Sequence, residues 1–420
     1  MKVHIIGSGI IGLFSAYYLH KAGCEVTIIE QTDGNDGCSY GNAGMIVPSH
    51  FIPLAAPGML SKGFQWMFDS SSPFYIKPRL DWSLVQWGIG FMRAANQKKV
   101  KQFMPVLRDI SLWSKQLYQE IASEKMLDFG FEQNGLLMLC KTEHTLEEEA
   151  HTAQIANQLG IAARVLTRTQ VHELEPELKP EVAGGVMFEG DTHCMPNLLV
   201  KNLKEYLYQR GVEFLYNARL ENILSDKNQI SELWIDQKGE SLKLKTEQVV
   251  LAAGSWSEQL AKTLKLKLPI QAGKGYSFTE QQKEQKKLNT PSILTEARVA
   301  VSPFQHQIRF GGTMELGGIN SKINMLRVKG IVEAVNAYFP DYELAIPKKE
   351  NVWQGLRPCS PDGLPYIGGS GVFKNLCIAT GHAMMGISLA PATGKMVTEA
   401  CLSKPLSIAS SLLSPDRFSK

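Results

Sequence analysis

Three glycines close to the N-terminus have the spacing of a phosphate-binding turn. Gly7, Gly9 and Gly12 follow an apolar run at residues 3–6 and precede a segment with helical character. Gly7 would form the tight turn, Gly9 would let the backbone approach a pyrophosphate, and Gly12 would let helix and strand pack closely. The free amides at the start of the helix favour negative charge. This pattern predicts binding of a dinucleotide.

The elements around these glycines complete a strand–helix–strand unit. The residues predict a helix at 13–22 and a second strand at 25–29, followed by Glu30, which lies 18 residues after Gly12. An acid at this distance can accept hydrogen bonds from a ribose. A glycine-rich turn in an ordinary α/β domain is the alternative. The other residues of this unit expected to contact the dinucleotide are Ile10, Ile11 and Gln31.

The composition limits the classes of protein to which the chain can belong. With 420 residues, 44% of them hydrophobic, the chain is long enough for two domains with cores of their own. A net charge of +3 without a long basic run argues against nucleic acid as a partner. Seven scattered cysteines without a CxxC pair predict a reduced protein with no metal site and no disulfide framework.

The hydrophobic runs predict no membrane-spanning segment, because none has the length of about 18 residues that a span requires. A strand that begins at the second residue leaves no room for a signal peptide, so we expect a cytoplasmic protein. Association with the inner face of the cell membrane stays open. The aromatic residues from Phe64 to Phe91 would suit either a docking face for a membrane or partner, or core and pocket lining.

Segments typical of a dinucleotide-binding fold occur at the start, the middle and the end of the chain. We therefore expect an α/β fold in which a discontinuous Rossmann-like domain is interrupted by an α+β domain with an inserted antiparallel sheet. The predicted boundaries are 1–50, 190–268 and 348–420 for the first domain, and 51–189 and 269–347 for the second. Helices are predicted at 84–95, 105–123, 145–159, 196–210 and 328–338, and strands at 135–140 and 212–216. Short strands near 223, 230–235 and 242–244 predict a small antiparallel sheet.

Five separated motifs resemble those of one enzyme family, and they occur in the family's order from Val3 to Gly394. Besides the opening unit, they are Ser39-x-x-Asn42-Ala43-Gly44-Met45, Val250-Leu251-Ala252-Ala253-Gly254-Ser255-Trp256-Ser257, Gly355-Leu356-Arg357-Pro358-x-x-Pro361-Asp362-Gly363 and Gly381-His382-x-x-x-Gly386. The chain is similar to the FAD-dependent D-amino-acid oxidase and dehydrogenase family, which also holds glycine oxidase and sarcosine oxidase.

Within this family the chain most resembles bacterial D-amino-acid dehydrogenases, which also have Gly41-Asn42-Ala43-Gly44 and Lys274-Gly275-Tyr276. The stretches 47–50 and 55–58 resemble a branch that acts on D-proline or 4-hydroxy-D-proline. The resemblance therefore implies a Rossmann-like FAD-binding domain and a substrate-binding domain with the boundaries given above.

The resemblance implies further contacts with FAD. The loop after Glu30 would return to the phosphates and the ribityl chain, and the start of the final helix would face flavin N1 and the C2 carbonyl. Without the resemblance, these motifs could also be surface or helix-cap turns. Non-covalent FAD is expected, because Cys359 is displaced from the position of the covalent link in sarcosine oxidase. The implied contacts are Ser39, Asn42, Ala43, Gly44, Met45, Leu220, Ala252, Ala253, Gly254, Trp256, Gly355, Gly381, His382, Ala383, Met384, Met385, Gly386 and Ile387.

Arg357 is expected to clamp the substrate carboxylate through a bidentate pair, with a surface salt bridge as the alternative. Tyr276 would add a hydroxyl to the same carboxylate, unless it is a core tyrosine. His50 would line the pocket beside the flavin. His382 is expected to contact the substrate as well as FAD. The residues after His382 lack the arginine that glycine oxidase has there, so a second cationic contact must come from elsewhere.

The reaction that the resemblance implies is oxidation of a D-amino acid. A hydride passes from Cα to flavin N5, and the resulting imine is hydrolysed to a 2-keto acid. No catalytic side-chain acid or base is expected, because orientation over the flavin and stabilisation of its reduced form supply the rate. A quinone or electron carrier is the expected acceptor. The alternatives are a glycine- or sarcosine-type amine oxidase that uses O2, a nicotinamide-dependent dehydrogenase, and a non-catalytic FAD-holding subunit of a hetero-oligomer.

Overall fold

The opening strand–helix–strand unit is formed as predicted. The computed structural model describes residues 1–57, 74–77 and 79–419. In it, β1 (Lys2–Ile6) and β2 (Glu25–Ile29) flank α1 (Ile10–Lys21) and pair in parallel. The helix is buried on most of its surface, which explains why its sequence is apolar on nearly every side.

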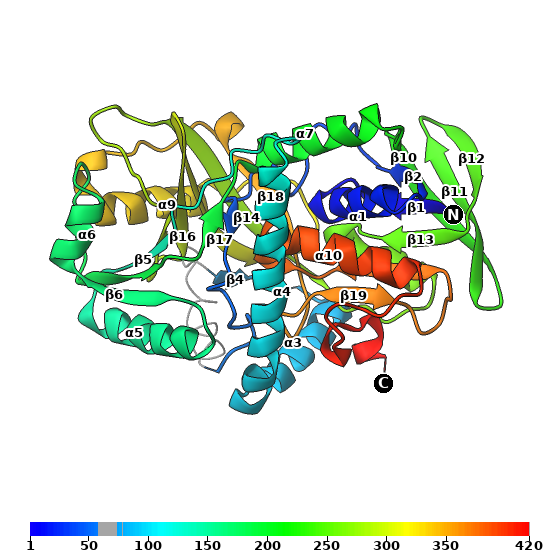
Figure 1. Cartoon of the computed structure of the whole chain (residues 1–420), viewed down its shortest axis with the longest axis horizontal. Coiled ribbons are helices and arrows are strands. Elements are labelled where there is room, and N and C mark those ends of the chain that lie inside the picture. Colours follow the sequence, from blue (N-terminus) through cyan, green and yellow to red (C-terminus); the bar gives the residue numbers. More distant parts are fainter. Residues whose placement is uncertain (58–73, 78, 420) are drawn as a thin grey trace.

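A six-stranded sheet brings together strands from distant parts of the chain (Figure 1). In spatial order its strands are β19 (Tyr366–Gly369), β20 (Leu376–Thr380), β13 (Gln248–Leu251), β1, β2 and β9 (Glu213–Leu215). β19 and β20 pair antiparallel, and the other neighbours pair in parallel. This is the sheet of a Rossmann-like fold, assembled from the first, middle and last parts of the sequence as predicted.

A larger, mainly antiparallel sheet fills the other end of the molecule (Figure 1). In spatial order its strands are β18 (Trp353–Cys359), β14 (Gln271–Gln281), β17 (Gln307–Leu316), β16 (Val299–Phe304), β15 (Ser292–Leu294), β5 (Leu136–Cys140), β7 (Gly184–Phe188) and β6 (Ala163–Thr167), and β4 (Phe74–Ile76) pairs with β17. β18 lies within the range predicted for the first domain, and it pairs with β14 of the larger sheet. The domain division itself stays a prediction.

The described residues also form two smaller sheets. The predicted small antiparallel sheet is confirmed, and it consists of β10 (Ala218–Asp226), β11 (Gln229–Gln237) and β12 (Glu240–Lys245). β3 (Met45–Ile46) pairs with β8 (Thr192–His193). This short pairing joins the loop after β2 to a segment almost 150 residues later in the chain.

The helix α10 (Gly386–Cys401) packs between α1 and the long helix α4 (Gln97–Ser123), as Figure 1 shows. Phe14, Tyr118 and Ile387 from these three helices share one buried cluster. The Tyr118 hydroxyl also donates to the Ile387 carbonyl at 2.7 Å. Among the described residues, the other α-helices are α3 (Trp82–Ala94), α5 (Glu143–Gln158), α6 (Arg168–Leu174), α7 (Pro196–Gln209), α8 (Ser257–Thr263) and α9 (Met325–Tyr338).

The start of α4 corrects a prediction. We expected this helix to begin at Pro105, from its apolar face at helical spacing. In the structure it begins at Gln97, where the Asn96 side chain accepts a hydrogen bond from the Lys99 amide, and Pro105 lies inside it. The cap supplied by Asn96 therefore sets the start, and the proline does not.

The aromatic segment expected at 64–91 divides into three parts. Phe64, Trp66 and Phe68 lie outside the described residues. Trp87 is buried and donates to the Cys359 carbonyl at 2.8 Å, whereas Trp82 is exposed. Trp87 therefore belongs to the core.

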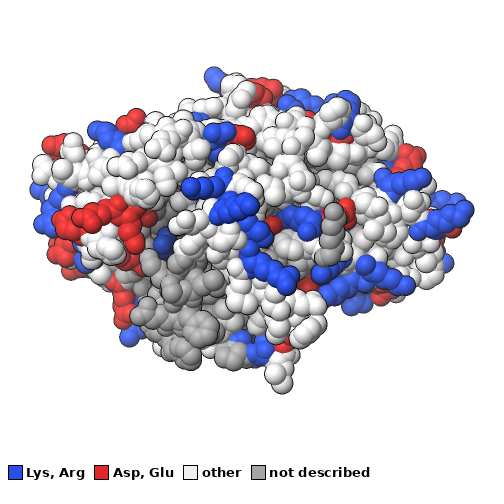
Figure 2. Space-filling model, turned by 90° about the horizontal axis from the view of Figure 1, so that it is seen from below, with Lys and Arg blue, Asp and Glu red and all other residues white. Residues whose placement is uncertain are grey.

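The surface carries both signs of charge. On the face seen from below, acidic side chains gather toward the end that holds α5 and α6, and Lys and Arg lie over the middle and the opposite end (Figure 2). Among the described residues, no helix is both long enough and apolar enough to cross a bilayer.

Candidate functional site

A cavity of about 1040 Å³ lies at the carboxyl ends of β1, β2, β13 and β20. Residues of β14, β17 and β18 in the larger sheet form its opposite wall. Ligands of open α/β sheets bind at the carboxyl ends of the strands. The volume is at the upper end of the roughly 300–1,000 Å³ typical of ligand sites, so the cavity has room for a dinucleotide and a small second molecule.

The start of α1 is shaped to receive a phosphate. Gly7 has a left-handed φ of 108°, and a Cβ there would lie 2.6 Å from the Ala252 carbonyl oxygen. Gly9 is the N-cap of α1 and has no side chain to cap the helix, and the Ile10 amide at the first helical position donates to the Ser39 hydroxyl at 3.2 Å. The nearest atom to a Cβ at Gly9 would be the Ser39 Oγ, 3.9 Å away, so the space beside Gly9 is open. The turn that the glycine spacing predicted is therefore formed, and a helix N-terminus of this kind is suited to an anion. Its contact with a phosphate stays a prediction.

Glu30 ties this turn to the end of β2. One carboxylate oxygen accepts from the Ser8 amide at 3.0 Å and from the Ser8 hydroxyl at 2.8 Å. The other oxygen accepts from the amide and hydroxyl of Thr32, both at 3.0 Å. Glu30 also lines the cavity. Its predicted hydrogen bond with a ribose stays a prediction.

The larger sheet holds the loop that follows β2. Side chains on its strands form hydrogen bonds to successive carbonyl oxygens of the loop. The Ser277 hydroxyl donates to Gly41 at 2.7 Å, Arg309 Nη1 donates to Asn42 at 2.7 Å, and the Ser302 hydroxyl donates to Ala43 at 2.7 Å. The loop is therefore fixed from outside the six-stranded sheet, with its other face toward the cavity.

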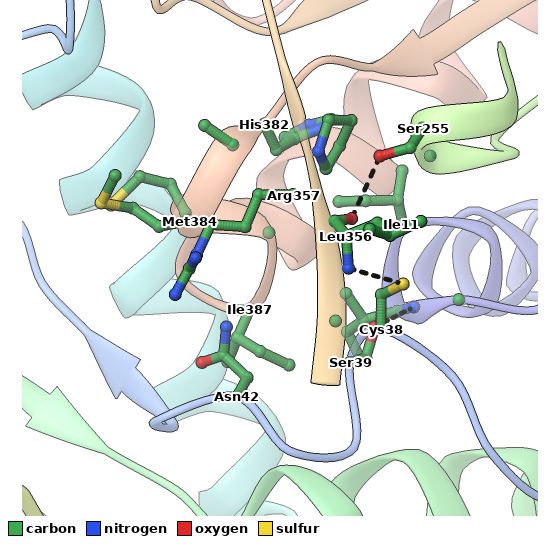
Figure 3. A pocket seen from close by; sticks show the side chains of 18 of the residues that line it. Ile11, Cys38, Ser39, Asn42, Ser255, Leu356, Arg357, His382, Met384 and Ile387 are labelled. Atoms are coloured by element: carbon green, nitrogen blue, oxygen red, sulfur yellow. Dashed lines mark hydrogen bonds between the residues drawn. The ribbon is translucent and has the colours of Figure 1, made fainter. Parts of the chain in front are cut away.

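β18 is tied to two turns of the six-stranded sheet through Leu356. The Leu356 amide donates to the Cys38 sulfur at 3.3 Å, and its carbonyl accepts from the Ser255 hydroxyl at 3.1 Å (Figure 3). These bonds join the loop after β2 and the turn after β13 to one strand of the larger sheet. The next residue on that strand is Arg357, so the same contacts position the predicted substrate arginine.

Arg357 lines the cavity and is half-buried. Its Nη1 donates to the Thr313 carbonyl at 2.7 Å, and within the described part of the chain it has no carboxylate partner. Burial lowers its pKa, but an arginine stays charged at neutral pH. In Figure 3 the side chain extends to the side of the cavity where Met384 and Asn42 are drawn. A half-buried cation without a protein anion is suited to bind a carboxylate.

The Tyr276 hydroxyl, which was predicted to contact the substrate carboxylate, has partners within the protein. Its ring lines the cavity, but its hydroxyl donates to Glu315 at 3.1 Å and accepts from the Asn324 amide at 3.3 Å. Glu315 is also 3.4 Å from Arg327. The hydroxyl therefore belongs to a buried polar network, and the predicted contact with a substrate carboxylate stays a prediction.

The final helix begins at the cavity wall. α10 has no side-chain cap at its N-terminus, and the residues 383–387 before and at its start line the cavity. His382 is buried, with its Nε2 3.0 Å from the Thr393 hydroxyl, and burial lowers its pKa to about 3. The imidazole is therefore neutral at physiological pH. The Nδ1 of His382 has no hydrogen-bond partner among the described residues.

A family model described as FAD dependent oxidoreductase matches residues 2–400. The chain belongs to the FAD-dependent oxidoreductase family. FAD is therefore its cofactor, and the nicotinamide-dependent alternative is set aside. A D-amino acid dehydrogenase of Helicobacter pylori is 31% identical over 396 residues, which cover 94% of this chain and 93% of that protein.

Two solved structures share the fold of this FAD-dependent oxidoreductase over nearly their whole length. Glycine oxidase from Geobacillus kaustophilus matches with a TM-score of 0.78 and 24% identity, over 99% of this chain and 98% of that one. L-proline dehydrogenase from P. horikoshii matches with a TM-score of 0.74 and 20% identity, over 100% and 97%. These likenesses confirm the predicted fold class.

The cavity of this FAD-dependent oxidoreductase brings together most of the predicted cofactor residues. Those that line it are Gly7, Gly9, Ile10, Ile11, Glu30, Gln31, Ser39, Asn42, Ala43, Met45, Leu220, Ala252, Ala253, Gly254, Trp256, Gly355, His382, Ala383, Met384, Met385, Gly386 and Ile387. Arg357, Tyr276 and His50 line it as well. Two open helix N-termini and a long cavity fit FAD.

Three predicted cofactor residues do not line the cavity, and each packs against the protein instead. A Cβ at Gly12 would lie 2.0 Å from the Gly7 carbonyl oxygen, and one at Gly44 would lie 2.0 Å from that of Cys194. A Cβ at Gly381 would lie 2.7 Å from the Tyr366 ring. These glycines allow close approach within the FAD-binding fold. For Gly12, this is the close packing that the sequence predicted.

Several lining residues were missed by sequence reasoning. Arg298 and Lys204 bring two further cations to the cavity, and burial lowers the pKa of Lys204. Arg298 lies in an exposed turn with a left-handed φ of 54°, and no local motif marks it. Ser49 lies in the stretch 47–50, which resembles the branch that acts on D-proline, and this resemblance assigns no role to Ser49. Its contact with Asp191 could not have been found, because the two residues are 142 positions apart.

Proposed function

We propose that this chain is an FAD-dependent dehydrogenase of D-amino acids, with D-proline and cis-4-hydroxy-D-proline as the candidate substrates. The observation that carries the proposal is the half-buried guanidinium of Arg357, which lines the cofactor cavity and has no carboxylate partner in the described part of the chain. The name of the H. pylori relative, which covers nearly the whole chain, supports an amino acid as the substrate.

The residues of the chain bind and orient the two reactants. Bound FAD supplies the two-electron oxidation by accepting a hydride from the substrate Cα. Gly7, Gly9 and the amides at the start of α1 hold the pyrophosphate, and the open start of α10 holds the flavin ring. Arg357 fixes the substrate carboxylate, which sets the direction of the Cα–H bond. With a primary amine, the product imine is then hydrolysed by water to a 2-keto acid, whereas a proline-like substrate gives a cyclic imine.

No side chain is proposed as a catalytic acid or base. His382 is neutral and bonded to Thr393, so it serves to hold the turn before α10. FAD is proposed to bind without a covalent link. Cys359 is fully buried beside Gly273 and does not line the cavity, which supports this assignment.

The electron acceptor is proposed to be a quinone or another electron carrier, as in a dehydrogenase. A location in the cytoplasm, with contact to the inner face of the cell membrane, would suit such an acceptor. An oxidase of glycine or sarcosine that uses O2, and a non-catalytic FAD-holding subunit, are the alternatives that the experiment below separates.

The deciding experiment is the visible spectrum of the purified protein, recorded without oxygen before and after addition of substrates. The panel contains D-proline, cis-4-hydroxy-D-proline, D-alanine, glycine, sarcosine and the L-enantiomers. We expect the flavin bands to bleach with D-amino acids, and reoxidation to be faster with a soluble quinone than with O2. Bleaching by glycine or sarcosine alone would contradict the proposal, and so would bands that persist with every compound.

A further inference from the structure

A chain of hydrogen bonds runs from the cavity wall into the protein interior. The Ser49 hydroxyl donates to Asp191 Oδ2 at 2.5 Å, and the Ser49 amide donates to Asp191 Oδ1 at 3.2 Å. The same hydroxyl oxygen lies 3.1 Å from His50 Nδ1. Ser49 and His50 line the cavity, whereas Asp191 is buried behind them.

The direction of these bonds determines which nitrogen of His50 carries the proton. A serine hydroxyl has one hydrogen, and when Asp191 is ionised this hydrogen is donated to the Asp191 carboxylate. Its oxygen can therefore act only as an acceptor toward His50, so the hydrogen of a neutral imidazole lies on Nδ1. The lone pair is then on Nε2. In the part of the chain that the structure describes, Nε2 has no hydrogen-bond partner, and it is left for a ligand in the cavity.

The surroundings of this site favour a neutral His50 imidazole and a neutral substrate amine. Burial, with a smaller contribution from the Arg298 cation, lowers the pKa of His50 to about 4, so the imidazole is neutral at physiological pH. Arg298 and Arg357 both line the cavity. Two cations in one cavity disfavour a bound ammonium group and favour the free amine. A free amine is the form of the substrate from which Cα can lose a hydride.

We propose that His50 Nε2 accepts a hydrogen bond from the amino group of the bound substrate, and that Ser49 and Asp191 are positioning residues that fix its tautomer. With Arg357 on the carboxylate, this gives the substrate two anchors, one on each side of Cα. A proline-type amine has a single N–H, and donating it to His50 fixes the direction of the nitrogen lone pair. The inference rests on the proposed function, because it concerns the same substrate.

The test compares two planar carboxylates that differ in one atom. Pyrrole-2-carboxylate has a ring N–H where furan-2-carboxylate has an oxygen. Dissociation constants for the FAD-loaded protein are measured from the perturbation of the flavin spectrum and by calorimetry. The measurements are made at about pH 8, because burial raises the pKa of Asp191 to about 7 and the carboxylate is then ionised. We expect the wild-type protein to bind the pyrrole about tenfold more tightly, the factor that one hydrogen bond of ordinary strength provides.

Variants of the three residues identify the source of this preference. His50→Leu is expected to abolish the preference for the pyrrole and to leave binding of the furan within about twofold. His50→Gln, which keeps an acceptor oxygen, is expected to restore part of it. Ser49→Ala and Asp191→Asn are expected to reduce the preference with His50 in place. Glu175→Gln is the matched control, because Glu175 is a buried carboxylate that accepts backbone amides and lies outside the cavity lining.

The contrary outcomes separate this inference from the proposed function. A preference that persists in His50→Leu, or equal binding of both compounds by the wild-type protein, would overturn the role of His50. Unchanged preference in both Ser49→Ala and Asp191→Asn would overturn the positioning role. If D-amino acids bleach the flavin in these cases, the proposed function survives. If neither carboxylate binds the wild-type protein, the assignment of Arg357 fails, and the proposed function fails with it.

Discussion

Gly275 on β14 and Arg357 on β18 lie so close together that a Cβ at position 275 would be 2.1 Å from Nη1 of the guanidinium. The two residues are diagonal neighbours across an antiparallel pair in which Gly275 faces Gly355 and Gly273 faces Arg357. The guanidinium therefore occupies the space that any side chain at 275 would need. A glycine on one strand thus sets the position of the charge on the other.

The variant Gly275→Ala should displace the Arg357 guanidinium. Because a hydrogen-bonded contact to a charged group contributes about 1.5–3 kcal/mol, we expect affinity for furan-2-carboxylate to fall at least about tenfold. Spectral titration of the FAD-loaded variant measures this. Gly369→Ala on β19 is the control, because a Cβ there would meet no atom within 4 Å and the residue lies outside the cavity lining. Equal losses in the two variants would argue against a specific effect on Arg357.

Removal of the guanidinium itself tests the carboxylate contact. Arg357→Ala should raise the KM for a D-amino acid by roughly 30-fold to 1,000-fold, or about 2–4 kcal/mol, because the carboxylate loses a half-buried charge partner. Steady-state kinetics with D-proline measures the effect, and pyrrolidine, which lacks the carboxylate, is the matched substrate. The wild-type protein should prefer D-proline over pyrrolidine and the variant should not. An unchanged KM would remove Arg357 from the substrate site.

Replacement of Glu30 should weaken the binding of FAD. Its carboxylate accepts four hydrogen bonds from Ser8 and Thr32, and it orders the turn at which we place the pyrophosphate. In Glu30→Ala we expect the dissociation constant of FAD to rise at least about tenfold, which corresponds to about 1.4 kcal/mol. Fluorescence titration of the apoprotein measures it. Asp33→Ala, which removes an exposed acid of the same loop, should leave FAD binding unchanged.

The buried imidazole of His4 should make stability depend on pH. Burial lowers its pKa to about 4 from 6.5, and its Nδ1 bonds to the Thr246 hydroxyl at 2.8 Å. Between these values the unfolded chain binds a proton that the folded protein excludes. The free energy of unfolding should therefore fall as the pH is lowered from about 6.5 to about 4, by up to about 3 kcal/mol from this group.

Urea unfolding at several pH values compares His4→Gln with the wild-type protein. The variant should lose part of the slope in this window, whatever its stability at neutral pH. His151→Gln, at an exposed position of α5, should keep the wild-type slope. Identical slopes in all three proteins would show that His4 titrates normally in the folded state.

The sequence predicts the part of the site that depends on residues close together in the chain. Glycine spacing, an apolar strand and a helix within 30 residues specify the phosphate turn. Arg357 was found through a motif, but its environment was not. Gly275, Thr313 and Arg357 meet because β14, β17 and β18 pair side by side, and pairing over such separations leaves no local signal.

The contact between Ser49 and Asp191 and the position of β18 escaped prediction for the same reason. Both depend on which distant segments lie together. The start of α4 escaped for another reason, because the helix was predicted from its apolar face at helical spacing and not from a cap. The hydrogen bond of the Asn96 cap sets its start.

The interleaving of the six-stranded sheet has a consequence for biosynthesis. β1 and β2 are translated before their neighbour β13, which follows more than 200 residues later, and before β20, which follows more than 100 residues after that. α10, which packs against α1 and contributes to the cavity, is translated later still. A nascent chain therefore has the phosphate turn long before it has a place for the flavin. Loading with FAD must wait until α10 has left the ribosome.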